Sequence, residues 1–285
     1  HNNNPREQEP MKYLPVKGDA ENGEMSMPRL PLSEAKEVVE RMFQRYSDSN
    51  FNAELWKARH NNNPRTLAYC AAVSRLMRDA RDEILSEFGL PTGPDGDVAL
   101  AIAVAEYHFD ADMTVLLNLN DEILYDSETP MVQGGLALPK KQVLQALREM
   151  IHVFVDPVFQ RKLRYVKVSN RKSMVDDCYR LKGRDNIVRP IQEEILKRYA
   201  VPGGQYIAVH GFFQMFAQYI MDPEVAAHGT AINLLLGMEP PACKHFVDRL
   251  REIAVTDPPA SKPPPPRPPP PGKSAKTDTV SLKSW

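Results

Sequence analysis

The chain has 285 residues, of which 36 are Lys or Arg, 37 are Asp or Glu and 42% are hydrophobic, with a formal net charge of −1. These fractions are typical of a globular protein and exclude a collagen-like, wholly disordered or disulfide-stapled chain. Proline is the exception, because the 26 prolines make up about 9% of the chain, against roughly 5% on average.

The three cysteines, Cys70, Cys178 and Cys243, are far apart and form no CxxC pair. The sequence therefore indicates neither a disulfide framework nor a zinc ribbon. The first residues do not resemble a signal peptide. The longest apolar run, residues 98–104, is far below the roughly 20 residues of a membrane helix. We expect a soluble intracellular protein, located in the cytoplasm and without a transmembrane segment.

Apolar residues recur at intervals of three and four along most of the middle of the chain, a spacing that predicts amphipathic helices. The expected helices, in chain order, run from a cap at Ser33 to Tyr46, and over residues 66–88, 97–109, 110–125 and 140–155. Asp156-Pro157 and Asp222-Pro223 each predict a further helix start, because aspartate caps well and proline suits the first helical position. Only residues 164–169 alternate as a strand does.

These elements predict an all-α fold, an irregular bundle of helical hairpins that forms one domain over residues 31–255. Residues 1–30 show no apolar periodicity and are expected to be a disordered arm. Residues 256–285 are expected to be a disordered, proline-rich tail. Its segment 262–273 carries two runs of four prolines, a composition that favours an extended polyproline II rod.

Two parts of the chain resemble each other. Residues 83–93 (EILSEFGLPTG) match residues 194–204 (EILKRYAVPGG), which lie 111 positions later. Residues 105–110 match 217–222, which lie 112 positions later, and the Asp156-Pro157 junction echoes Asp222-Pro223. The matches predict an internal duplication, with halves over about 66–130 and 175–240.

The proline rod is the first candidate binding site, because such rods dock in the aromatic grooves of SH3, WW and EVH1 domains. Its flanking basic residues fit both orientations of such a ligand. The alternative is a stiff spacer or a solubilising tail. The candidate partner-binding residues are Lys262, Pro265, Arg267, Pro268, Pro271 and Lys273.

The second candidate is the segment 161–189, which holds ten basic and three acidic residues. Such a density could bind phosphate groups of RNA, of a nucleotide or of anionic lipids, with Tyr165 and Tyr179 available for stacking. The alternative is a solvated helix face with local ion pairs. The candidate residues for binding an anion or a nucleic acid are Arg161, Lys162, Arg164, Lys167, Arg171 and Lys172.

A metal site is also conceivable at Glu106, His108, Asp110 and Asp112, if these residues lie in an extended loop. A helix would scatter them, and the repeated Asp110 favours a helix cap. We therefore predict no metal site and no cofactor.

The chain contains no phosphate-binding loop, dinucleotide fingerprint, nucleophile elbow or zinc-protease motif. The absence of these motifs favours a non-enzymatic interaction or scaffold protein. In this hypothesis the helical domain binds one partner, and the tail recruits another that has a proline-recognition domain. The first alternative is nucleic-acid or anionic-ligand binding through residues 161–189. The second is an enzyme with unfamiliar motifs and a small-molecule pocket between its helices.

Overall fold

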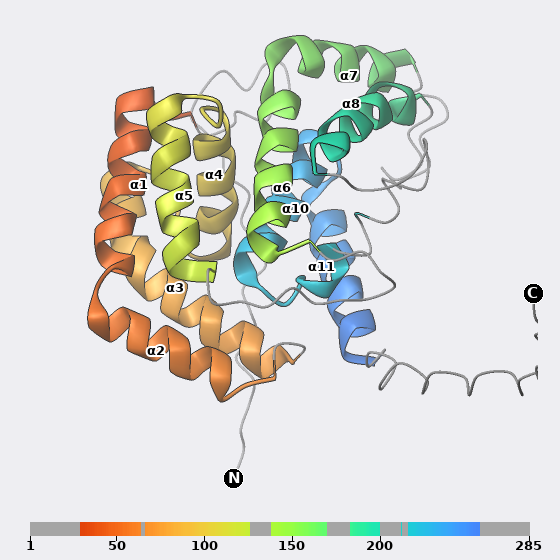
Figure 1. The fold of residues 1–285 in the computed structure, drawn as a ribbon. Helices are drawn as coiled ribbons and strands as arrows, with labels where there is room; N and C mark the ends of the chain where they lie inside the picture. Colours follow the sequence, from red (N-terminus) through yellow and green to blue (C-terminus); the bar gives the residue numbers. More distant parts are fainter. Residues whose placement is uncertain are drawn as a thin grey trace, which may run out of the picture.

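The structure is a computed structural model that describes residues 29–63, 66–125, 138–169, 183–199, 212 and 216–256. Within these residues it contains helices and no strand, which confirms the all-α prediction (Figure 1). The helices are α1 (Leu32–Tyr46), α2 (Ser49–His60), α3 (Leu67–Glu87), α4 (Gly93–Ala105), α5 (Ala111–Tyr125), α6 (Lys140–Val155), α7 (Pro157–Ser169), α8 (Arg184–Arg198), α10 (Pro223–Leu235) and α11 (Pro240–Thr256). Across these ranges, no helix combines the length and apolar character that crossing a membrane requires.

One predicted cap, one predicted strand and the bounds of one predicted helix are wrong, since the helix expected over residues 97–109 is α4, Gly93–Ala105. Ser33 does not cap α1 but lies inside it, because the helix begins at Leu32 after Pro31 and has no side-chain cap. Residues 164–169 form no strand but the last turns of α7. The reason is the burial of Phe159 and Leu163, which lie four residues apart on one side of a helix.

Two helices are buried on all sides and lie at the centre of the molecule. Every residue of α4 from 96 to 105 is buried, and so is every residue of α10 from 223 to 232. A helix that is apolar all round belongs in a core, and α4 and α10 pack against each other. In Figure 1, α1, α3, α4 and α5 lie on the left, and α6, α7, α8, α10 and α11 on the right.

The same contacts occur twice along the chain, 108 positions apart. The Oδ1 atom of Asp48 accepts two backbone N–H bonds at the start of α2 (2.8 and 3.1 Å), and Asp156 does the same at the start of α7 (2.6 and 3.3 Å). The side-chain amides of Asn52 and Gln160 each donate to a backbone carbonyl at the end of the preceding helix (2.7 and 2.5 Å). The two helix junctions are therefore built alike.

Aromatic packing repeats at the same interval. The rings of Tyr46 and Phe51 lie 5.1 Å apart, centre to centre, where α1 meets α2. Those of Phe154 and Phe159 lie 4.9 Å apart where α6 meets α7. Each pair closes the junction between the first two helices of its half.

A third repeated contact fixes the beginning of each half. The hydroxyl of Tyr107 donates to the carbonyl oxygen of Leu30 (2.7 Å), and that of Tyr219 donates to the carbonyl oxygen of Leu138 (2.8 Å). Both leucines precede a proline and then the first helix of their half. The tyrosines lie 112 positions apart and the leucines 108. The segment from the leucine to the tyrosine is therefore a few residues longer in the second half than in the first.

The described fold thus consists of two repeats followed by α11, and α1, α2, α3 and α5 have their counterparts in α6, α7, α8 and α10. The stretch between α8 and α10, which would match α4, falls largely outside the described residues. The predicted halves 66–130 and 175–240 are too short, because each repeat begins with the helix that follows Leu30 or Leu138. The echo of Asp156 with Asp222 is also misassigned, since the counterpart of Asp156 is Asp48.

Replacing Tyr107 or Tyr219 by phenylalanine removes one of the paired hydrogen bonds. We expect each change to lower the free energy of unfolding by about 1 kcal/mol, because a half-buried carbonyl loses its donor. The double variant should lose about the sum, since the two bonds share no partner. Urea denaturation measures both losses. Tyr165→Phe is the control and should have no effect, because Tyr165 is exposed; an equal loss there would contradict the assignment.

Candidate functional site

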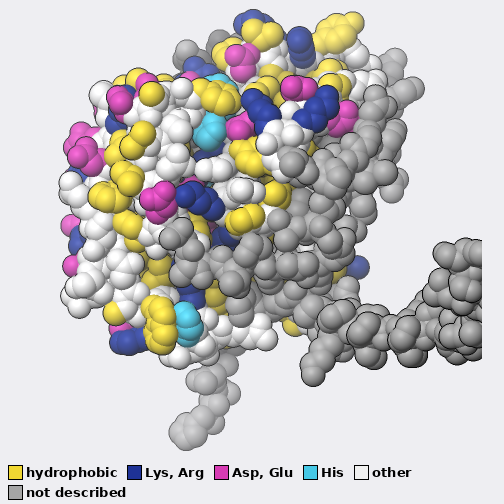
Figure 2. All heavy atoms as spheres, viewed as in Figure 1, with side chains coloured by type: hydrophobic (Ala, Val, Ile, Leu, Met, Phe, Trp, Pro, Cys, Tyr) yellow, Lys and Arg dark blue, Asp and Glu magenta, His cyan; other side chains and the backbone are white. Residues whose placement is uncertain are grey.

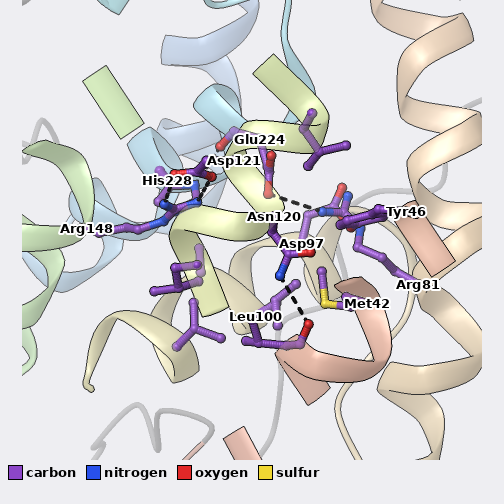
Figure 3. A pocket seen from close by; sticks show the side chains of 15 residues that line it. Met42, Tyr46, Arg81, Asp97, Leu100, Asn120, Asp121, Arg148, Glu224 and His228 are labelled. Carbon is purple, nitrogen blue, oxygen red and sulfur yellow. Dashed lines mark hydrogen bonds and ion pairs between the residues drawn. The ribbon is translucent and has the colours of Figure 1, made fainter. Parts of the chain in front are cut away.

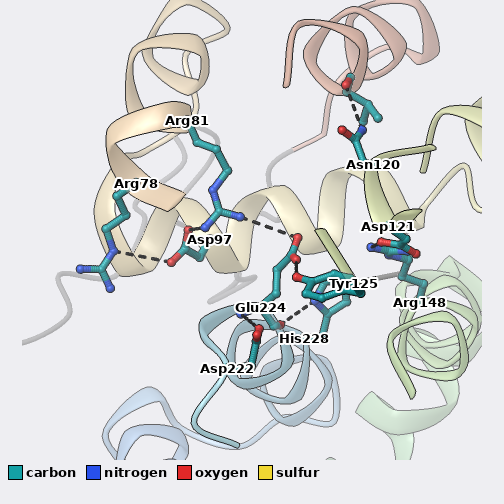
Figure 4. Close-up of polar contacts among 11 residues, drawn as sticks. Arg78, Arg81, Asp97, Asn120, Asp121, Tyr125, Arg148, Asp222, Glu224 and His228 are labelled. Atoms are coloured by element: carbon teal, nitrogen blue, oxygen red, sulfur yellow. Dashed lines mark hydrogen bonds and ion pairs between the residues drawn. The ribbon is translucent and has the colours of Figure 1, made fainter. Parts of the chain in front are cut away.

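Five charged side chains are buried between the two repeats, and we call them the charge cluster. Each is at most 8% exposed. The charge cluster consists of Arg81 from α3, Asp97 from α4, Asp121 from α5, Arg148 from α6 and Glu224 from α10. Three of its members come from the first repeat and two from the second, so it forms where the repeats meet (Figure 4).

Arg81 joins the two central helices. Its Nη2 lies 2.5 Å from Oδ1 of Asp97, and its Nη1 lies 3.8 Å from Oε1 of Glu224. The hydroxyl of Tyr125 donates to the other oxygen of Glu224. Burial raises the pKa of Glu224 to about 7, although the positive charge of Arg81 opposes this shift. The folded protein therefore binds a proton on Glu224 more tightly than the unfolded chain does.

Arg148 and Asp121 form the second ion pair across the repeats. Both guanidinium Nη atoms meet the carboxylate, at 2.6 and 2.9 Å. The side chains are 4% and 1% exposed, so almost no water screens the pair. Such a two-pronged contact fixes the direction as well as the distance between two groups. It therefore holds α6 in a defined register against α5.

A cavity of about 30 Å³ lies beside the charge cluster (Figure 3). Burial lowers the pKa of His228 to about 3, so this residue is neutral. Its Nδ1 lies 2.8 Å from the carbonyl of Glu224 and donates there, which leaves Nε2 as an acceptor. Nε2 and the Oδ1 of Asn120 have no donor among the described residues. This volume is enough to hold water and is far below the roughly 300–1,000 Å³ of ordinary ligand pockets.

Lys140 and Asp222 form a further buried ion pair within the second repeat, at 2.8 Å. Burial acts to raise the pKa of Asp222, but the charge and hydrogen bond of Lys140 outweigh it, and the pKa is lowered. The Nζ of Lys140 also lies 4.8 Å from the ring centre of Tyr125. Asp222 additionally caps α10 through the backbone N–H of Glu224 (3.0 Å). This pair therefore connects the start of α10 to the edge of the charge cluster.

Sequence reasoning missed all five residues of the charge cluster. A signal was present, because Asp97 and Glu224 stand at the starts of segments that are apolar on every side. A helix apolar all round is buried, so charged residues near its end are buried too and need partners. The chemistry of the cluster is that of an internal ion-pair network.

The candidate metal ligands do not converge. Asp110 caps α5, accepting the backbone N–H of Met113 (3.0 Å), and Lys36 pairs with both Asp110 and Asp112 (2.9 and 2.8 Å). Burial is the main cause that lowers the pKa of His108 to about 4. The described ranges contain no group of three or more His, Cys, Asp or Glu side chains placed to hold a metal ion.

The structure brings four of the six predicted anion-binding residues together on α7. Arg161, Lys162 and Arg164 are exposed there, and Lys167 is half-buried. The other two, Arg171 and Lys172, lie outside the described residues, as do Cys178 and Tyr179. Further along the segment, Arg184 and Arg189 both lie within 4.0 Å of Asp185.

All the candidate residues of the tail lie outside the described part of the chain. They are Lys262, Pro265, Arg267, Pro268, Pro271 and Lys273.

No protein-family model matches the chain, and no curated protein or solved structure matches it either. The geometry defines an all-α protein of two helical repeats joined through a buried charge cluster.

Proposed function

We propose that this chain is a non-enzymatic interaction protein, whose helical repeats bind one partner and whose proline-rich tail recruits another. The second helix of each repeat carries the observation on which the proposal rests. Trp56 on α2 is 59% exposed, and Tyr165 on α7 is 75% exposed. Large aromatic side chains are enriched where proteins meet, and here both repeats present one to solvent.

The buried charges support the same proposal. Every member of the charge cluster has a partner of opposite charge within the protein, and the adjacent cavity of about 30 Å³ is far smaller than an ordinary ligand pocket. These groups hold the repeats together, which gives the outer helices a rigid support. The enzyme alternative gains no support from this cavity.

The tail is tested with the full chain and a panel of purified SH3, WW and EVH1 domains. We expect at least one domain to bind, and Pro265→Ala/Pro268→Ala/Pro271→Ala to weaken that binding roughly tenfold or more. The matched control is Pro258→Ala/Pro259→Ala, which changes prolines outside the rod. The tail's role is disproved if no domain binds, or if both sets of substitutions act alike.

Binding of a nucleic acid is the second candidate function. The observation that favours it is the exposed pair Arg161 and Lys162, for which the described residues provide no ion-pair partner, beside the exposed ring of Tyr165. A basic surface with an aromatic ring is suited to single-stranded RNA. Strong weakening of binding with added salt would be its signature.

A further inference from the structure

The outward face of α7 carries four residues spaced three, four and three apart. They are Val158, Arg161, Tyr165 and Val168, and we call them the α7 seam. Its apolar members are 49%, 75% and 62% exposed. This spacing is that of the a and d positions of a heptad, the stripe through which one helix packs along another.

The fold itself does not require apolar residues in the α7 seam. The counterpart helix α2 carries polar or small residues 108 positions earlier, and all of them are exposed. They are Asn50, Ala53, Lys57 and His60. Since α2 and α7 share the same caps and the same aromatic junction, the apolar residues of the α7 seam serve something other than folding.

All the charged side chains of α7 are positive. The helix contains four basic residues and no acidic residue. Lys162 lies beside the α7 seam and Arg164 at its edge, and both are exposed. Figure 2 shows dark-blue and yellow side chains near one another along the upper edge of the molecule, where α7 lies, with magenta side chains of other residues among them. Acidic side chains are the complement of such a surface.

We propose that the α7 seam docks an acidic amphipathic helix of a partner protein. Apolar residues of that helix would pack on Val158, Tyr165 and Val168, while its flanking carboxylates would pair with Arg161 and Lys162. This inference rests on the proposed function, because it gives the partner class of the helical repeats. Two valines and one aromatic ring favour a helix over a nucleic acid, which needs rings for successive bases.

The test uses the full chain and a fluorescent synthetic peptide of about four heptads, with leucine at positions a and d and glutamate at e and g. The same peptide with lysine at e and g is the comparison. We expect the acidic peptide to bind roughly tenfold more tightly or better, as measured by fluorescence anisotropy. Tyr165→Ser/Val168→Ser and Arg161→Glu/Lys162→Glu should each weaken that binding roughly tenfold.

The matched control is Lys57→Ser/His60→Ser at the counterpart positions of α2, which should leave binding unchanged. All these side chains are exposed, and circular dichroism verifies that each variant is folded. A gain-of-function variant moves the α7 seam and its neighbour Lys162 to the first repeat: Asn50→Val/Ala53→Arg/Glu54→Lys/Lys57→Tyr/His60→Val. It should add a second site and so double the number of peptides bound per chain.

The inference is overturned if the acidic peptide does not bind, or binds no better than the basic one. Binding that the α7 substitutions leave unchanged would also overturn it. Tight binding of single-stranded oligouridine, lost in the same variants and at high salt, would assign the α7 seam to nucleic acid instead. The tail variant Pro265→Ala/Pro268→Ala/Pro271→Ala should bind the peptide normally, so a failure of the α7 seam and a failure of the tail are distinguishable.

Discussion

Replacing Asp121 by asparagine is expected to lower the free energy of unfolding by about 3–5 kcal/mol. The carboxylate of Asp121 receives two bonds from Arg148, and both side chains are almost fully buried. An amide keeps the shape but not the charge, so the guanidinium would remain buried without a counter-ion. Urea denaturation at pH 7 measures the loss.

The double variant Arg148→Met/Asp121→Leu separates the cost of an unpaired charge from the value of the pair. Because it removes both charges and fills the space, we expect a stability near that of the unchanged protein, or about 1–4 kcal/mol higher. Glu194→Gln is the surface control, since its ion pair with Lys197 is exposed. It should cost about 1 kcal/mol or less. If Asp121→Asn lowered the free energy of unfolding no more than Glu194→Gln does, the ion pair of Asp121 with Arg148 would not be what holds the repeats together.

Two ion pairs of opposite sign favour the pairing of α1 with α3 and of α6 with α8 over the exchanged pairing. Arg41 on α1 pairs with Glu87 on α3 (2.7 Å), whereas the counterpart pair has the opposite signs, with Glu149 on α6 and Arg198 on α8 (2.8 Å). If α1 and α6 exchanged places, arginine would face arginine and glutamate would face glutamate. These like-charge contacts would disfavour an exchange of helices between two repeats of similar shape.

The sequence predicted best the helices that have a single apolar face. Residues 140–155 were predicted as a helix and form α6 with the same bounds, because one side is buried and the other is polar. The helix expected over 97–109 is α4, which runs instead from Gly93 to Ala105. A helix that is apolar all round has no periodic face to mark its ends, so local residues such as the proline after Gly93 decide its start.

The sequence revealed the duplication only in the segments where the two repeats have similar residues. The matches of 83–93 and 105–110 lie at the ends of the third and fourth helices, where turns and caps restrict the choice of residue. In the first two helices the contacts are conserved between repeats while the residues differ, as Asn52 and Gln160 illustrate. The sequence could indicate that Asp97 and Glu224 are buried but not which residues they pair with, since Arg81 and Glu224 are 143 positions apart and only the tertiary fold brings them together.

Glu224→Gln is expected to stabilise the protein by roughly 3 kcal/mol at pH 8 and by less than about 1 kcal/mol at pH 4.5. Burial is the main cause that raises the pKa of Glu224 from 4.5 to about 7, with Asp121 and Asp97 adding to it and Arg81 opposing it. The folded protein therefore holds this proton more tightly than the unfolded chain. Its stabilising effect is complete below about pH 4.5 and is lost as the pH rises to about 7.

Glutamine imitates the protonated carboxyl group and cannot ionise, so the variant avoids the loss at high pH. The measurement is the difference in the free energy of unfolding between the two proteins, taken by urea denaturation across this pH range. Groups that lie far from Glu224 titrate alike in both proteins and cancel in the difference. A loss of stability that is equal at pH 4.5 and pH 8 would contradict the expectation. It would mean that Glu224 stays ionised in the folded protein, where its attraction to Arg81 outweighs the cost of burial.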